Sequence, residues 1–257
     1  MHKAWLLAGG VTTALMTSGC VVVVADDGDD SKIFRQEHRE GGYIVLDRDG
    51  DYSRLAGDMN LRGRLGGDLS LVAGDVDIDG LTVGGEVSIA GGDIDFRGSA
   101  DGEISIAGGD VEFDGEAGDE LSIAAGDLDV AGRVRGEASL AAADMNLTAR
   151  FEDGLVAQAD HVEFSGDVAG RFKLVAAEEL KRRRMGDPEH GLVVISGTVR
   201  DGGDVCARTV RFENGANIGG ALNVWAENAP EMSGNASVPG LNFVPRDGRD
   251  CDDILDD

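Results

Sequence analysis

Two stretches of this sequence decide its fold: GEVSIAGGDIDF at residues 85–96 and GEISIAGGDVEF at residues 102–113. The shared aspartate recurs along the chain in steps of 17, 18, 17, 17, 17 and 16 residues, at Asp58, Asp75, Asp93, Asp110, Asp127, Asp144 and Asp160. A unit this short cannot bury its own apolar face, so it must stack on its neighbours. The repeat therefore predicts a solenoid, and a sequence given over to stacking argues against an enzyme.

Apolar and polar residues alternate within each copy, which is the period of a β-strand with one buried face. One strand buries two columns that begin at Leu69 and Leu71, with serines between them at Ser70, Ser88, Ser105, Ser122 and Ser139. A second strand buries columns that begin at Val76 and Ile78. A corner follows, where we expect a positive φ at Gly80, Gly98, Gly115, Gly132 and Gly166. We therefore predict an all-β, single-domain parallel β-helix of 17–18-residue coils, with two well-marked sides and a more variable third side.

The composition narrows the function. The formal net charge of the chain is −26, which excludes a nucleic-acid interface because phosphate contacts need clustered lysine and arginine. The same acidity favours solubility and a generic association with cations.

The N-terminus reads as a targeting segment. Lys3 precedes an apolar run from Ala4 to Met16, and Thr17-Ser18-Gly19-Cys20 follows. This segment resembles a bacterial lipoprotein signal peptide, 1–19, with its lipobox, although Thr17 stands where that family usually has an aliphatic residue. The resemblance implies that Cys20 carries a lipid and anchors the protein to a membrane. Val21, where a retention signal would place aspartate, favours the periplasmic face of the outer membrane of a Gram-negative bacterium. An ordinary secretory signal is the alternative.

The rest of the chain divides by composition. We expect an acidic tether at 20–32, a first strand or cap at 33–54, regular β-helix repeats at 55–177, a basic loop at 178–190, looser coils at 191–244 and an acidic C-terminal tail at 245–257. The basic loop contains Lys181, Arg182, Arg183 and Arg184. It is either an exposed insertion at one corner or a patch that contacts anionic lipid, polysaccharide or an acidic neighbour.

Residues 191–244 carry a family resemblance. The pattern is a strand, Gly-Ala-x-Ile-x-Gly at 215–220, a further strand, and Ala-x-Val-x-Gly at 236–240. It resembles the bactofilin, or polymer-forming cytoskeletal, family, and it extends more loosely over 55–177. The resemblance implies a right-handed β-helix that stacks end to end without nucleotide. Most members of that family are cytoplasmic and lack a lipobox, so the cytoskeletal role does not carry over directly. The chain also resembles adhesin-type repeat domains of bacterial envelopes.

Two cysteines remain besides Cys20. In an oxidising periplasm Cys206 and Cys251 are able to pair and hold the C-terminal tail against the solenoid. The alternative is two unpaired thiols.

The aspartate column is the sharpest candidate for a binding site. Stacked carboxylates about 5 Å apart repel by ~3 kcal/mol at an effective dielectric near 20, before screening. Either turn amides donate hydrogen bonds to them, or Ca²⁺ bridges the column. A second candidate for calcium, Asp47-Arg48-Asp49-Gly50-Asp51, lacks the glycine of a calcium loop at its sixth position, where Tyr52 stands.

Catalysis finds little support in the residues. The histidines are scattered, and no nucleotide-binding or nucleophile motif stands in a usable context. We therefore expect no catalytic residues and no cofactor. The leading hypothesis is a lipid-anchored envelope rod or scaffold that associates end to end with its own copies. The alternatives are a monomeric adhesin-like binding module, Ca²⁺-dependent or not, that uses the serine and aspartate columns as a flat array, and, more remotely, an enzyme that acts on cell-wall polysaccharide. A cell-wall polysaccharide is a candidate partner.

Overall fold

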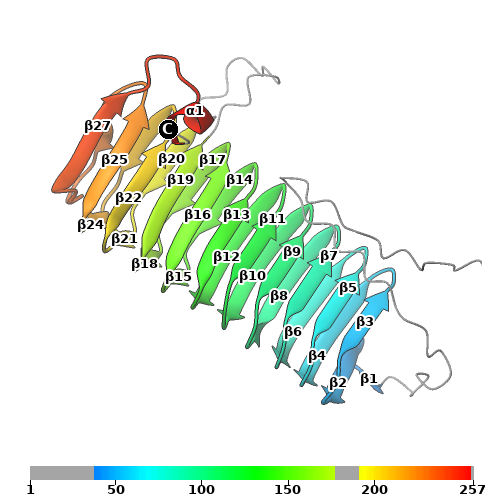
Figure 1. Ribbon diagram of the computed structural model, residues 1–257. Helices are drawn as coiled ribbons and strands as arrows, with labels where there is room; N and C mark the ends of the chain where they lie inside the picture. Colours follow the sequence, from blue (N-terminus) through cyan, green and yellow to red (C-terminus); the bar gives the residue numbers. More distant parts are fainter. Residues whose placement is uncertain (1–37, 177–190, 256–257) are drawn as a thin grey trace, which may run out of the picture.

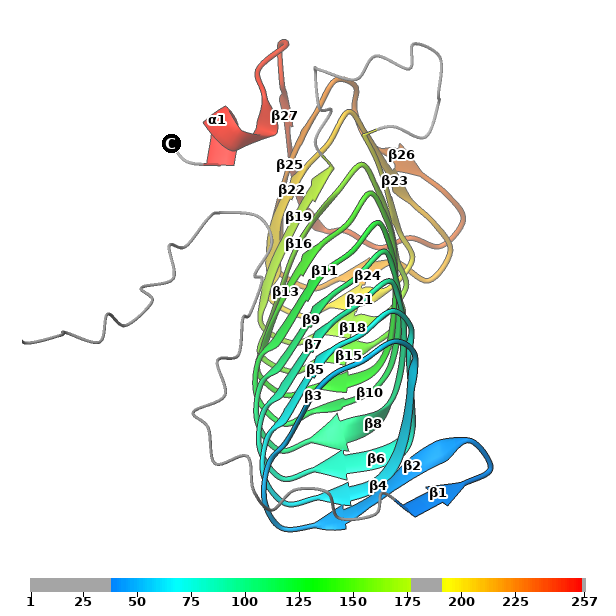
Figure 2. The ribbon, with the colours of Figure 1, turned by 90° about the vertical axis from the view of Figure 1, so that its right-hand side faces the viewer.

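Strands one coil apart pair in parallel and build a β-solenoid of about 11 turns, with coils of about 17 residues (Figure 1). The computed structural model describes residues 38–176 and 191–255. Viewed along its axis, the solenoid encloses a narrow, flattened interior (Figure 2). The predicted all-β solenoid fold is confirmed.

The larger of the two sheets, sheet A, has 16 strands. Twelve main strands follow one another along the axis of the solenoid. The first is antiparallel to its neighbour, and the other eleven are parallel to one another. In spatial order they are β1 (His38–Glu40), β2 (Tyr43–Arg48), β4 (Met59–Leu65), β6 (Val76–Val83), β8 (Asp93–Ala100), β10 (Asp110–Ala117), β12 (Asp127–Val134), β14 (Asp144–Leu147), β17 (His161–Phe164), β20 (Leu192–Ile195), β23 (Thr209–Phe212) and β26 (Glu231–Met232).

The third side of the coil is an extension of sheet A. In the early coils a single eight-residue strand such as β10 covers both sides. In the coils after β12 the second half forms separate short strands, which are β15 (Arg150–Phe151), β18 (Asp167–Val168), β21 (Thr198–Val199) and β24 (Asn217–Ile218). The third side is thus the more variable one, as the sequence indicated.

The smaller sheet, sheet B, has 11 parallel strands. From the N-terminal end they are β3 (Tyr52–Leu55), β5 (Leu69–Val72), β7 (Val87–Ala90), β9 (Ile104–Ala107), β11 (Leu121–Ala124), β13 (Glu137–Ala141), β16 (Gly154–Ala159), β19 (Arg171–Ala176), β22 (Gly202–Cys206), β25 (Ala221–Ala226) and β27 (Gly240–Pro245). The serine column stays in register from Ser53 to Ser139, after which Val156 takes its place.

The core is one cluster of buried side chains from the inward columns of both sheets. Phe96 and Phe113 stack with their ring centroids 5.3 Å apart, and both are fully buried. Identical or similar side chains meet one coil apart because the parallel register repeats every coil.

The corner glycines serve two different purposes. Gly80 and Gly132 have the predicted positive φ, of 71° and 92°. The expectation of a positive φ is wrong for Gly98, Gly115 and Gly166. A Cβ at those positions would lie 2.6, 2.5 and 2.1 Å from a carbonyl oxygen of the preceding coil, so close backbone approach requires glycine there.

The described strands on either side of the predicted basic loop belong to one array. β17 pairs directly with β20, so that Val162 lies beside Val193. The regular repeats and the looser coils at 191–244 are therefore one continuous solenoid.

The described part of the C-terminal tail folds back onto the solenoid. α1 (Cys251–Leu255) follows β27, and Cys251 forms a disulfide with Cys206 of β22, with their Cα atoms 5.7 Å apart. Cys251 and Ile254 pack with Val175 in a small cluster on the outer face of sheet B, against Trp225. α1 thus lies on a side of the rod, and the end of the rod stays uncovered by it (Figure 1).

Candidate functional site

The aspartate column lies at the corner where the strands of sheet A begin. Its first six members, all exposed, are Asp58, Asp75, Asp93, Asp110, Asp127 and Asp144. The seventh predicted member is wrong, because the structure places His161, and not Asp160, beside Asp144. Asp144 and His161 are 17 residues apart, so the coil keeps its usual length. The predicted step of 16 residues to Asp160 came from matching the residue type.

No metal centre emerges from this column. Within residues 38–176 and 191–255, no three or more His, Cys, Asp or Glu side chains are arranged to hold a metal ion. Hydrogen bonds from turn amides are made to another column, where the amides of Asp68 and Glu86 donate to the carboxylates of Asp51 and Asp68, at 3.0 and 2.9 Å. Calcium binding by the aspartate column remains a prediction.

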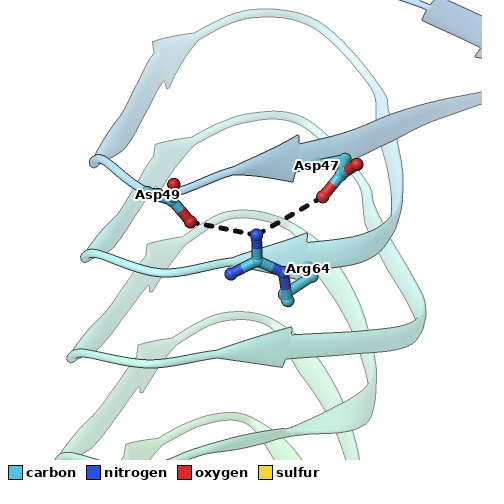
Figure 3. A network of polar contacts seen from close by, with 3 residues as sticks. All are labelled: Asp47, Asp49 and Arg64. Atoms are coloured by element: carbon cyan, nitrogen blue, oxygen red, sulfur yellow. Dashed lines mark hydrogen bonds and ion pairs between the residues drawn. The ribbon is translucent and has the colours of Figure 1, made fainter.

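In the second candidate calcium loop, at residues 47–51, an arginine side chain contacts the aspartates. The Arg64 guanidinium lies 2.9 Å from Asp49 and 3.5 Å from Asp47 (Figure 3). The hydrogen bond and charge of Asp49, with a smaller contribution from Asp47, raise the pKa of Arg64. Arg64 thus lies beside two of the carboxylates that a calcium ion would contact in this loop.

The remaining outer faces are crowded with carboxylates. On sheet A, Arg97 bridges Asp95 and Glu112, at 2.8 and 3.1 Å. At the turn before β9 of sheet B, partial desolvation, followed by the charges of Glu120 and Glu86, raises the pKa of Glu103. Two copies of the chain would therefore repel each other side by side.

A shallow polar depression of about 210 Å³ lies on sheet A beside His161. Its lining includes Asn146, Glu163, Arg211 and Ser196. The Nδ1 atom of His161 lies 3.6 Å from Asp144, and its Nε2 atom is buried without a hydrogen-bond partner. The sequence does not mark this feature, because Asp160 carries the residue type of the column and only the pairing of β14 with β17 puts His161 in its place.

The N-terminal end of the solenoid is closed. β1 runs antiparallel to β2 along the edge of sheet A, and Glu40 forms an ion pair with Arg62 at 2.9 Å. The inward side chains of the first coil are buried: Ile44 is 3% and Leu46 is 6% exposed. Short charged edge strands hinder the addition of further strands.

Sheet B is closed at the same end by a charge. Arg54 of β3 lies beside Leu71, so it occupies a position in an otherwise apolar inward column. Its Nη1 donates a hydrogen bond to the Tyr52 hydroxyl at 3.3 Å. An inward-pointing charge at an edge strand makes the strand a poor template for another chain.

The C-terminal end of the solenoid is open. The same inward column of sheet B ends in Phe243, beside Val224, and both Leu241 and Phe243 are only partly buried. Met232 of β26, the last strand of sheet A, is 49% exposed. The terminal coil therefore presents apolar side chains and the free edge of β27, and it is the candidate interaction site.

The outward column beside this edge ends in amides. Asn242 donates to Asn223, and Asn223 donates to Asp204, each at 3.0 Å. Asn242 is exposed on the outermost strand. This hydrogen-bonded column thus ends at the C-terminal end of the solenoid in the side-chain amide of Asn242, which has both donors and an acceptor.

Several predicted features lie outside the described residues. They are the signal peptide, Cys20, the acidic tether, and the basic residues Lys181, Arg182, Arg183 and Arg184. Within the described ranges, no helix combines the length and apolar character that a membrane crossing requires.

Comparisons with protein-family models, curated proteins and solved structures gave no match for this chain. The bactofilin-like pattern therefore stays a resemblance in sequence, and the function is argued from the geometry of the solenoid.

Proposed function

We propose that this protein is a lipid-anchored structural rod of the bacterial cell envelope, which associates with further copies through the end of its solenoid. The observation that carries the proposal is the terminal coil, in which the apolar column of sheet B stops at Phe243 on the outermost of the described strands. Unpaired strand edges with apolar side chains are templates for another chain.

The fold supports a mechanical role. The parallel register is continuous along the whole described solenoid, so the rod has a single core. Its pronounced acidity keeps the sides apart and favours contact through the end, where the outermost strand β27 carries no charge.

Sedimentation of the full chain in mild detergent tests the association. We expect the unsubstituted protein to sediment as an assembly and Phe243→Lys to sediment as a monomer, because lysine would place a charge in the contact. Val238→Asp alters another partly buried residue of the terminal coil and should act alike. Phe243→Leu keeps the column apolar and should still assemble, and Ser139→Lys is a charge control on the side of the rod. Identical sedimentation of all these proteins would refute the role of the end.

Membrane attachment is tested separately. Cys20→Ser should release the protein from the membrane fraction and abolish metabolic labelling with a fatty acid. Retention of the label in this variant would refute anchoring through Cys20.

The polar depression beside His161 supports a second candidate, a monomeric envelope module that binds a polysaccharide of the cell wall. Hydroxyl-rich ligands suit its Asn, Ser, Arg and Glu side chains. A monomeric wild type whose melting temperature rises with cell-wall fragments, and falls back with Asn146→Ala, would favour this module over the rod.

A further inference from the structure

The two ends of the solenoid differ in whether they accept another chain. At the N-terminal end, β1 covers sheet A and Arg54 interrupts the apolar column of sheet B. At the C-terminal end, β27 and β26 are the outermost strands, and Leu241 and Phe243 remain partly exposed. A rod with one adhesive end has no surface from which to continue growing.

We propose that two copies of this chain join C-terminal end to C-terminal end in a closed two-fold dimer, and that assembly stops there. The inference rests on the proposed function and names its partner, a second copy, and the stoichiometry. A contact that uses the same patch on both subunits closes on itself, whereas a head-to-tail contact would generate a filament.

The side chains at the C-terminal end are suited to contact the same end of a second copy. β27 has the sequence GLNFVP and carries no charge, and the charge of Glu231 on β26 is paired with Arg211 at 2.9 Å. The side-chain amide of Asn242 is able both to donate a hydrogen bond to Asn242 of the second copy and to accept one from it. The flanks of the rod, in contrast, are lined by carboxylates that would repel a second copy.

The strand parity limits the register of this contact to two-fold axes that pass through a residue, and we place the axis at Asn242, whose amide is self-complementary. Side chains directly opposite in an antiparallel pair lie on one face of the sheet, and Asn242 points outward while Phe243 points inward. A two-fold axis through Asn242 places Leu241 opposite Phe243 of the second copy, inside the joined core. It also leaves Pro245, which has no N–H to donate, beyond the paired residues 240–244.

The dimer would be a rod of double length with both N-terminal ends pointing outward. About 11 turns at ~4.8 Å each make one solenoid roughly 50 Å long, so the dimer spans about 100 Å. With the proposed anchors at the N-termini, such a rod is suited to linking two membrane surfaces.

Cysteine cross-linking tests the arrangement within one column. Ser53, Ser139 and Asn242 occupy the same outward column, at the N-terminal end, the middle and the C-terminal end of sheet B. Opposed Cα atoms in an antiparallel pair are about 4.5–5.5 Å apart, within the range of about 4.4–6.8 Å for a disulfide. Each residue is replaced by cysteine in the full chain carrying Cys20→Ser, and mild oxidation in detergent is followed by a non-reducing gel.

We expect Asn242→Cys alone to form a covalent dimer, with Ser53→Cys and Ser139→Cys remaining monomeric. Sedimentation of the chain without an added cysteine should level off at twice the monomer mass as its concentration rises. A cross-link that appears only when Ser53→Cys and Asn242→Cys are mixed, or a mass that keeps rising, overturns the closed dimer but leaves the self-associating rod in place. A mass that stays at one monomer overturns both the dimer and the proposed association.

Discussion

The disulfide between Cys206 and Cys251 should stabilise the C-terminal coils and not the whole rod. The bond closes a segment with a sequence separation of 45 residues, which contains β23 to β27. The chain-entropy relation for a loop of this length gives about 4 kcal/mol of stabilisation at 25 °C. In a solenoid each coil contacts only its neighbours, so the loss of this constraint stays local.

The perturbation is the double variant Cys206→Ser with Cys251→Ser, and the assay is native-state hydrogen exchange read by mass spectrometry. Peptides from β22, β25 and β27 should lose protection equivalent to as much as about 4 kcal/mol of opening free energy. Peptides from β6 to β12 serve as internal controls and should not change.

Reduction of the unsubstituted protein should reproduce the pattern, which separates the lost bond from the effect of serine. Because β27 forms the proposed contact, the double variant should also dimerise more weakly. An even loss of protection along the rod, or no loss in the last coils, would refute the reasoning.

Three further tests, with four substitutions, examine the coil itself. Phe113→Ala, which removes a fully buried ring from an aromatic stack, should lower the free energy of unfolding by about 3–5 kcal/mol in urea denaturation; a loss of less than about 1 kcal/mol would contradict the tight core. Gly80→Ala and Gly132→Ala share a positive φ, but only at Gly132 would the new Cβ meet backbone, at 2.1 Å from a carbonyl oxygen. Gly80→Ala should therefore cost about 1–2 kcal/mol and Gly132→Ala distinctly more, and equal losses would argue against close coil stacking. Burial and neighbouring carboxylates raise the folded-state pKa of Glu103 above 4.5, so the folded state holds the proton more tightly and stability falls as the pH rises through that window. Glu103→Gln should raise the melting temperature at neutral pH and lose this advantage below about pH 4, and a gain that is the same at both pH values would show that charge is not its cause.

Much of the fold could be predicted because every repeat has the same alternation of apolar and polar residues. The alternation around Ser88 and Ser105 sets which side chains point inward, and the 17-residue step sets which of them stack. Both are properties of neighbouring residues along the chain, and every copy of the unit repeats the same information.

The candidate site depended on features that occur once. Arg54 signals a closed end only when its register with Leu71 is known, because an arginine four residues before the first column aspartate reads equally well as a loop residue. The exchange of Asp160 for His161 in the aspartate column likewise needed the pairing of β14 with β17. In each case a shift of one residue along the strand would turn the side chain to the opposite face.

The sequence by itself determined that the chain is a β-solenoid, which residues fill its core and which columns face the solvent, because stacking identical short units admits one periodic solution. Only the tertiary structure decided how the solenoid ends: β1 turns back on β2, α1 docks on the side of sheet B, and β27 remains uncovered. An end has no neighbouring copy of the repeat to dictate its packing, so its exposure depends on long-range contacts that a periodic pattern does not encode.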